Sequence, residues 1–209
     1  MSEHNSSDPR VKLSFDGYVA TLTLARAEKL NALDMPMILA LQQAALDIEA
    51  NTEIRVAILT GEGKAFCAGG DIAAWGGLPP LDMWRTWTRA GHRAFDALAR
   101  LRVPLIAVLS GHAFGGGLEL AATADFLIAE THVKMGLPEA GLGMVPGWSG
   151  SQRLVRRFGS RVVKHLALTG DMLNAAEAYR LGMIDFITET DGAMVAAHVL
   201  ARKIAARGP

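Results

Sequence analysis

The sequence contains little cysteine and no excess of charge. Its 209 residues include one cysteine, Cys67, which excludes an internal disulfide and any metal site built from a cysteine cluster. Lysine and arginine together number 21, and aspartate and glutamate also number 21. Because the net charge is zero, no overall electrostatic attraction draws the chain to nucleic acid or to an anionic membrane. We expect a globular protein of a reducing compartment, the cytoplasm.

Long hydrophobic runs are also missing. No apolar stretch approaches the roughly 18 residues that cross a membrane. The opening MSEHNSSDPR lacks the charged-then-apolar order of a signal peptide. With 50 % hydrophobic and 20 % charged residues, the chain has enough apolar material for a single domain over residues 1–209. We place the core of this domain at about residues 10–190.

Common nucleotide-binding, hydrolase and metal motifs do not occur. There is no G-x-x-x-x-G-K-[ST], and no G-x-G-x-x-G follows a strand. The stretch GWSGS approaches the G-x-S-x-G nucleophile elbow, but Ser151 stands in place of the second glycine and the stretch follows a loop. The six histidines form no H-x-x-x-H pair. A serine hydrolase and a bound metal are therefore not expected.

What the sequence does contain is strands alternating with helices, which predicts an α/β fold. VKLSFDGYVATLTLA predicts a hairpin around an Asp-Gly turn, and Asp34 predicts the N-cap of the next helix. VAILTG, PLIAVLSG and DFLIAE are apolar without alternation, which is typical of parallel strands covered on both faces. The residues expected to face inward from the helix after Asp34 are Met37, Leu41, Ala44 and Ile48.

The later elements are mainly helical. MWRTWTRAGHRAFDALARL predicts a helix, and its large apolar residues recur near helical spacing as expected for packing. Beyond residue 149 we predict helices apart from the short strand MIDFIT, with a last helix over 191–207. The residues assigned to packing in the first of these helices are Trp84, Trp87, Phe95 and Leu98.

Two strand-to-helix junctions are rich in glycine. VAILTG leads into AFCAGGDI, and PLIAVLSG leads into HAFGGGLEL. Backbone N–H groups at a helix start lack partners and can bind a negative oxygen, and glycine lets a ligand approach them. Two such junctions can supply the two donors of an oxyanion hole. Tight turns and close packing of helix on sheet are the alternative reason for either cluster.

Five stretches, in register, carry a family resemblance. They are ARAEKLNAL (25–33), GKAFCAGGDI (63–72), GHAFGGGLELAATADFLIA (111–129), GLPEAGLGMVPGWSGSQRL (136–154) and ALTGDMLNAAEAYRLGMID (167–185). Over nearly its whole length the chain resembles the enoyl-CoA hydratase/isomerase (crotonase) family. The resemblance implies a spiral of β-β-α units with a mostly parallel sheet and outer helices. It also implies a homotrimer or a dimer of trimers.

The resemblance further implies an acyl-CoA thioester substrate. Coenzyme A is then part of the substrate, and no separate cofactor is expected. The thioester oxygen is expected between the N–H groups of Gly70 and Gly116, where charge develops in an enolate-like transition state. The acyl pocket is expected in residues 73–87 and at Trp148. Further residues that the resemblance places on the substrate or on CoA are Lys29, Ala32, Ala68, Asp71, Ile72, Gly115, Pro138 and Gly147.

One position departs from the family pattern. Several hydratases carry a lysine for a CoA phosphate where this chain has Ala73. Phosphate binding is then expected at Lys29, at Arg26 or on a neighbouring subunit. Cys67 lies in the same loop, in a slot that small residues fill, and we expect no nucleophilic role for it.

Two glutamates match the family's catalytic positions. Glu119 follows Gly116 by three residues, so a helix that begins at the glycines turns it toward the same site, and Glu139 matches the second carboxylate. In a shared, desolvated site one glutamate of such a pair can be ionised while the other is protonated. Addition of water across a C=C bond requires one base and one acid of this kind. The alternative for each is a solvated or helix-capping carboxylate. The resemblance thus implies an enoyl-CoA hydratase.

Other functions stay open at this point. Another CoA-thioester lyase or an enoyl-CoA isomerase would use the same oxyanion hole, although dienoyl isomerases carry an aspartate at the position of Gly147. A crotonase-fold RNA-binding protein would use the basic helix with Arg156 and Arg157, which we do not favour because little aromatic character interleaves with its charge.

The last helix raises a separate expectation. Relatives usually continue into helices that cover the active site, so the resemblance implies that the helix over 191–207 leads into a helical extension beyond these residues. In that case Val195, Val199 and Ile204 lack their usual apolar partner.

Overall fold

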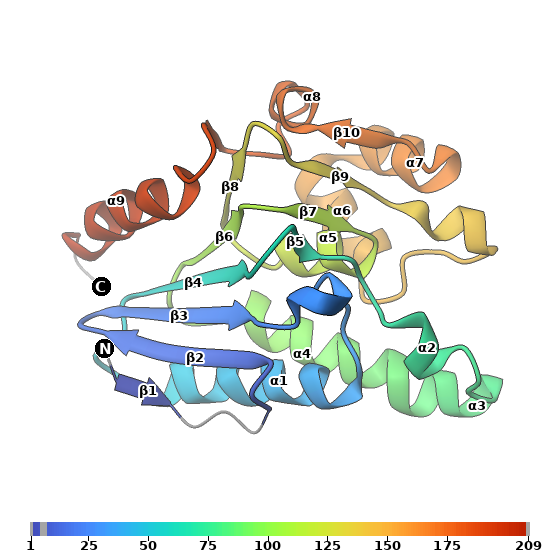
Figure 1. The fold of residues 1–209 in the computed structure, drawn as a ribbon, viewed down its shortest axis with the longest axis horizontal. Helices are drawn as coiled ribbons and strands as arrows, with labels where there is room; N and C mark the ends of the chain where they lie inside the picture. Colours follow the sequence, from blue (N-terminus) through green and yellow to red (C-terminus); the bar gives the residue numbers. More distant parts are fainter. Residues whose placement is uncertain (1, 5–7, 208–209) are drawn as a thin grey trace.

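The computed structural model describes residues 2–4 and 8–207 and is drawn in Figure 1. Within these residues the strands form a seven-stranded sheet, ordered β1-β2-β3-β4-β6-β8-β11, and a four-stranded sheet, ordered β10-β9-β7-β5. The strands are β1 (Ser2–His4), β2 (Val11–Asp16), β3 (Val19–Leu24), β4 (Val56–Gly61), β5 (Ala65–Cys67), β6 (Leu105–Leu109), β7 (His112–Phe114), β8 (Phe126–Glu130), β9 (Lys134–Gly136), β10 (Met172–Asn174) and β11 (Phe186–Thr188).

Helices surround the sheets and carry most of the rest of the described chain (Figure 1). Among them η1 and η3 are 3-10 helices and η2 is a π-helix. The helices are η1 (Ala27–Lys29), α1 (Met35–Ala50), α2 (Ile72–Trp75), α3 (Pro80–Asp82), η2 (Met83–Thr88), α4 (Arg89–Ala99), α5 (Gly116–Ala121), η3 (Pro138–Leu142), α6 (Gly150–Phe158), α7 (Ser160–Thr169), α8 (Ala175–Arg180) and α9 (Ala193–Ala205).

The predicted hairpin and the first long helix are confirmed. Strands β2 and β3 pair antiparallel around a turn in which Gly17 has a φ of 55°, a value that glycine adopts without strain. The Asp34 side chain accepts a hydrogen bond from the Met37 N–H at 3.1 Å and caps α1. The four residues expected to face inward from α1 are buried.

A repeated unit builds the spiral. Strand β4 of the large sheet leads into β5 of the small sheet, and β6 leads into β7 and β8 into β9 in the same way. Strands β3, β4, β6, β8 and β11 are mutually parallel neighbours, as are β5, β7 and β9. The predicted β-β-α organisation with a mostly parallel sheet is therefore confirmed. The parallel pairing of β5 with β7 brings both glycine-rich junctions to one edge.

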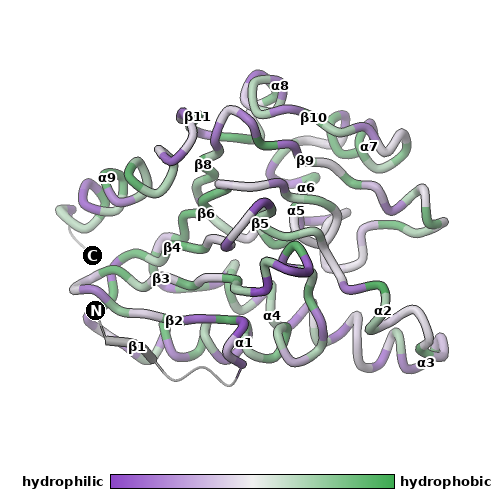
Figure 2. The backbone as a smooth tube through the Cα atoms, in the orientation of Figure 1, coloured by the Kyte–Doolittle hydropathy of each residue, from purple (hydrophilic) through white to green (hydrophobic). Residues whose placement is uncertain are grey.

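The central strands are apolar because both of their faces are covered. Along β4, Val56 and Ile58 face a cluster that α9 closes, whereas Ala57 and Leu59 face the main core with α1 and α4. In Figure 2 these strands are coloured mainly as hydrophobic. Burial on two faces explains why the runs in β4, β6 and β8 show no alternation.

Some features differ from the sequence predictions. The side chain of Trp84 is 57 % exposed, so its assignment to packing is wrong, while Trp87 and Phe95 are buried. The short strand β10 was not predicted, because three residues, of which only Leu173 is partly buried, are too few for an apolar pattern. On α9, Val195 and Val199 are exposed as expected, but Ile204 is partly buried against the core cluster, so the expectation that it lacks an apolar partner is wrong. Across the described residues, no helix is both long enough and apolar enough to cross a membrane.

Candidate active site

Each of the three consecutive glycines has its own structural reason. Gly115 has a φ of 52°, and a Cβ there would lie 2.8 Å from Oε1 of Glu139. A Cβ on Gly116 would lie 2.7 Å from Cζ3 of Trp148, and one on Gly117 would overlap the Cys67 carbonyl oxygen. We expected the bare backbone to admit a ligand. Instead, the space where each Cβ would lie is occupied by another part of the protein.

The two glycine-rich junctions lie against each other. A Cβ on Gly69 would be only 3.2 Å from the Gly116 nitrogen. The first junction is also tied to Leu33, whose N–H donates to the Gly69 carbonyl at 2.8 Å and whose carbonyl accepts from the Asp71 N–H at 2.7 Å. Within the described chain, neither the Gly70 nor the Gly116 N–H has a hydrogen-bond acceptor. The structure thus leaves two donors at the predicted oxyanion positions.

These donors and both glutamates line one cavity of about 150 Å³. Its walls are mainly apolar, with the glycine-rich backbone on one side and aromatic side chains on another. An apolar cavity with a few convergent polar groups is the usual form of a small-molecule site. The lining residues are Ala68, Gly69, Gly70, Ile72, Trp75, Met83, Trp87, Thr88, Gly115, Gly116, Glu119, Pro138, Glu139, Leu142, Met144, Val145, Gly147 and Trp148.

Glu119 is buried and held by backbone donors. It lies in the first turn of α5, and its Oε1 accepts hydrogen bonds from the Trp148 N–H at 2.8 Å and from the Gly150 N–H at 2.6 Å. The pKa of Glu119 is raised to about 7, mainly by burial and also by the charge of Glu139. The two backbone hydrogen bonds and Arg153 act in the opposite direction on this pKa. Glu119 can therefore gain or lose a proton near neutral pH.

Glu139 is also buried but has fewer partners. It lies in the first turn of η3, and its Oε2 is a buried oxygen without a hydrogen-bond partner among the described residues. Burial raises the pKa of Glu139, and a hydrogen bond from its own backbone N–H opposes the rise. An unpaired, desolvated carboxyl oxygen beside a cavity is available to a substrate or to water.

The loop that carries Trp148 is fixed to α4. The Trp148 carbonyl accepts a hydrogen bond from Arg153 at 3.3 Å, and Arg153 forms an ion pair of 2.6 Å with Asp96 on α4. His92, also on α4, shares a 2.6 Å hydrogen bond between its Nδ1 and Oγ of Ser149. Ser149 has a φ of 71°, which is uncommon for a residue with a side chain.

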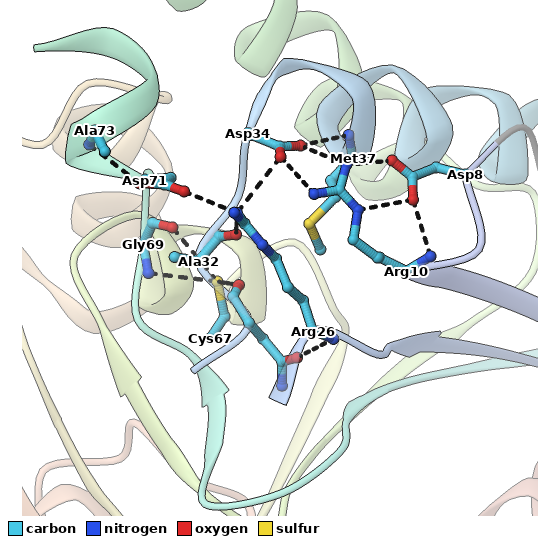
Figure 3. Close-up of polar contacts among 11 residues, drawn as sticks. Asp8, Arg10, Arg26, Ala32, Asp34, Met37, Cys67, Gly69, Asp71 and Ala73 are labelled. Atoms are coloured by element: carbon cyan, nitrogen blue, oxygen red, sulfur yellow. Dashed lines mark hydrogen bonds and ion pairs between the residues drawn. The ribbon is translucent and has the colours of Figure 1, made fainter. Parts of the chain in front are cut away.

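A chain of alternating charges supports the first glycine-rich junction (Figure 3). Arg26 contacts Asp71 at 2.9 Å and Asp34 at 3.5 Å, and Asp34 also contacts Arg10 at 2.6 Å. The other Asp71 oxygen accepts a hydrogen bond from the Ala73 N–H at the start of α2. Arg26 also donates to the Ala32 carbonyl at 2.8 Å. Its guanidinium is thus engaged within the protein, which leaves Lys29 as the more accessible cation of the two suggested for CoA phosphate.

Five of the eight residues assigned to the substrate or to CoA line the cavity together with Glu119, Glu139, Gly70 and Gly116. They are Ala68, Ile72, Gly115, Pro138 and Gly147.

The other three, Lys29, Ala32 and Asp71, lie outside the cavity, and the Asp71 carboxylate is bonded within the protein. The sequence analysis missed the lining residues Leu142, Met144 and Val145. Their loop follows Glu139, and apolar residues in a glycine-rich loop directly after a candidate acid were the available sequence signal.

Cys67 plays no visible part in the cavity. It is completely buried at the end of β5, and its Sγ donates to the Asn31 carbonyl at 3.2 Å. Burial raises the pKa of Cys67 to about 12, so the thiolate is not available near neutral pH. No cluster of three or more histidine, cysteine or acidic residues suited to a metal ion occurs among residues 2–4 and 8–207.

Comparison with known proteins agrees with this geometry. The model of the enoyl-CoA hydratase/isomerase family matches residues 14–209, and the chain belongs to this family. The crotonyl-CoA hydratase of Syntrophomonas wolfei is 35 % identical over 191 residues, which are 91 % of this chain and 73 % of that protein. The short-chain-enoyl-CoA hydratase of Clostridium acetobutylicum is 36 % identical over 200 residues, 95 % of this chain and 76 % of that protein.

Solved structures show the same fold. The enoyl-CoA hydratase of Bacillus anthracis superposes with a TM-score of 0.91 at 33 % identity, covering 96 % of this chain and 78 % of that one. Pseudomonas aeruginosa DspI superposes with a TM-score of 0.93 at 30 % identity, covering 98 % of this chain and 78 % of that one. The chain therefore has the crotonase fold.

Proposed function

We propose that this chain is an enoyl-CoA hydratase in which two backbone donors and two glutamates act on a 2-enoyl-CoA thioester. The activity rests on family membership and on relatives named as enoyl-CoA hydratases over most of the chain. The mechanism rests on one observation: Glu119 and Glu139 line the same cavity as two glycines whose N–H groups have no acceptor among the described residues.

In the proposed reaction the thioester oxygen accepts hydrogen bonds from the N–H groups of Gly70 and Gly116. These donors stabilise the negative charge that gathers on the oxygen as water attacks the β-carbon. One glutamate takes a proton from water while the water oxygen bonds to the β-carbon, and the other glutamate delivers a proton to the α-carbon. The electrons of the C=C bond form the new C–H bond, and the reverse sequence removes water.

The electrostatics of the pair suit this exchange. Burial raises both carboxyl pKa values, and the charge of Glu139 further disfavours ionisation of Glu119. Near neutral pH the pair can therefore hold one proton between them, which supplies one base and one acid. Because the two groups are coupled, a titration will report pKa values of the pair.

Oxygen incorporation tests the proposal. Crotonyl-CoA is incubated with the protein in isotopically labelled water, and the label is sought at the β-carbon of the product. Replacing either acid, Glu119→Gln or Glu139→Gln, should lower hydration by roughly 100- to 10,000-fold, because glutamine keeps the shape but cannot exchange a proton. The exposed Glu53 offers a matched control, Glu53→Gln, that should hydrate normally.

An isomerase would give a different result. Double-bond migration without label at the β-carbon, fatal loss in Glu139→Gln and mild loss in Glu119→Gln would reject the hydratase mechanism. It would leave the oxyanion hole in place. Of the two arginines that the RNA-binding alternative would use, Arg157 is engaged with Asp185, whereas Arg156 is exposed.

We also propose a homotrimer or a dimer of trimers in the cytoplasm. The crotonase resemblance suggests the assembly, and exposed apolar residues on the outer helices, such as Leu39, Leu46 and Leu168, offer surface for it. Light scattering on the purified protein would measure the mass, and a monomer at micromolar concentration would refute the assembly.

A further inference from the structure

The indole of Trp148 lies under both oxyanion glycines. A Cβ on Gly70 would be 3.2 Å from its Cη2, and one on Gly116 would be 2.7 Å from its Cζ3. On the other side, a Cβ on Gly91 of α4 would overlap the indole nitrogen. The ring therefore occupies space that three glycines from separate segments leave open, and it is only 4 % exposed.

Neighbouring rings and hydrogen bonds hold the indole in place. Its centroid lies 5.3 Å from that of Trp87 and 5.2 Å from that of Phe95, the latter edge to face. The backbone on either side is bonded to Glu119, Arg153 and, through Ser149, to α4. A side chain held by packing and by its own backbone is a rigid wall.

The position of this wall relative to the reacting atoms matters. The thioester oxygen is expected at Gly70 and Gly116, and the β-carbon beside the glutamates, one of which accepts a hydrogen bond from the Trp148 N–H. Acyl carbons beyond the β-carbon that stay in the cavity of about 150 Å³ lie between the indole and the loop with Leu142 and Val145, two residues that are exposed at its opening.

We infer that Trp148 is the specificity-determining floor of the acyl pocket and restricts this enzyme to short 2-enoyl groups. The inference rests on the proposed function, because it assumes that a thioester occupies the oxyanion glycines. A longer chain would have to displace an indole that is packed against backbone on both sides. Rejection follows from steric exclusion, since glycine backbone cannot move aside as a flexible side chain can.

The experiment measures kcat/KM over 2-enoyl-CoA thioesters of increasing length, starting from crotonyl-CoA. In the wild type, kcat/KM should fall by roughly tenfold or more between four and eight carbons, within the range that pocket methylenes discriminate. Trp148→Ala should raise the ratio of eight-carbon to four-carbon kcat/KM by roughly 10- to 100-fold. Trp148→Leu, which keeps an apolar filling, should give an intermediate ratio. Circular dichroism verifies that each variant is folded.

Of the stretch 73–87 expected in the acyl pocket, Trp75, Met83 and Trp87 line the cavity, whereas Trp84 is exposed and does not. Trp84 therefore provides a matched control. Trp84→Ala should keep the wild-type length preference. A wild type that hydrates long and short chains equally, or a folded Trp148→Ala that keeps the preference, would overturn the inference. The first result would mean that the acyl chain leaves past the exposed Leu142 and Val145, and the second would place the length limit on another residue.

Binding separates this inference from the proposed function. Calorimetry with saturated acyl-CoA thioesters of the same lengths requires no hydration. If no enoyl-CoA is hydrated but affinity still falls with length and recovers in Trp148→Ala, the hydratase proposal fails and the role of Trp148 stands. If hydration is observed without any length dependence, the hydratase proposal stands and the role of Trp148 fails.

Discussion

Glu119 and Glu139 face one cavity from two different kinds of surroundings. Glu119 is embedded in α5, and two backbone N–H groups from the Trp148 loop fix its Oε1. Glu139 lies on the short η3, and its buried Oε2 has no partner within the described chain. Burial raises the pKa of both, but only Glu119 has backbone donors from a separate loop to oppose it. The same residue type thus becomes a rigidly positioned group in one place and an unpaired one in the other.

The largest effect should come from displacing Glu139. In Gly115→Ala the new Cβ would collide with the Glu139 carboxyl, and φ at this position is 52°. We expect kcat/KM for crotonyl-CoA to fall at least roughly a hundredfold, because small misplacement of a catalytic group costs that much. Gly17→Ala is the matched control, since Gly17 has a φ of 55° and open space around its Cα.

The Gly17 control should lose about 1 kcal/mol of unfolding free energy through backbone strain and keep full activity. Should Gly115→Ala retain activity, the precise placement of Glu139 would be unimportant, and the distinction between the two glutamates would lose its functional meaning.

The buried Glu119 should make the stability of the protein depend on pH. Burial moves the pKa of Glu119 from 4.5 to about 7, so the folded state binds this proton more tightly than the unfolded chain does. The resulting stabilisation is complete below pH 4.5 and is lost as pH rises through 7. Glu119→Gln has no such proton to lose and still offers an oxygen to the Trp148 and Gly150 N–H groups.

The unfolding free energy of Glu119→Gln relative to wild type should therefore increase with pH. Between pH 4.5 and pH 8 the increase should be on the order of 3 kcal/mol at most. Urea unfolding at several pH values measures it. A constant difference across this range would show that Glu119 ionises normally in the folded protein. Glu139→Gln should show a change of the same sign, because burial raises the pKa of Glu139 as well.

The smallest expected effect comes from Arg153. Its charge lowers the pKa of Glu119, so Arg153→Gln should move the titration of Glu119 to higher pH. The pH–rate profile should show the shift, and the lost ion pair with Asp96 should cost about 1 kcal/mol of unfolding free energy. Arg156→Gln, at an exposed position on the same helix, should leave the profile unchanged. Equal pH–rate profiles for both variants would show that the charge of Arg153 does not influence the pKa of Glu119.

The sequence predicted the fold well because its signals were local. The Asp-Gly turn, the Asp34 cap and the doubly apolar runs each act through near neighbours, and each appears in the structure. The pairing of glutamates and glycines in one cavity was also expected, through the family resemblance. The short strand β10 was not, since three residues, of which only Leu173 is partly buried, carry little pattern and pair with a strand far along the chain.

Contacts between distant segments could not be predicted. Nothing near Gly91 in the sequence indicates that the ring of Trp148 fills its missing side chain. Arg26 was a candidate for phosphate, but the fold gives it Asp71 and Asp34 as partners. Such pairings depend on the relative placement of whole elements, which local propensity does not encode.

The rate at which a thiol reagent labels Cys67 reports how often the active-site loop opens. Cys67 is completely buried, and its Sγ also accepts a hydrogen bond at 3.4 Å from the N–H of Gly69, which directly precedes the proposed oxyanion donor Gly70. A thiol reagent can reach this sulfur only when the loop opens, so the labelling rate counts openings without any engineered probe. A saturating substrate analogue that bridges Gly70 and Gly116 should lower the labelling rate of Cys67, because each opening would then require release of the ligand.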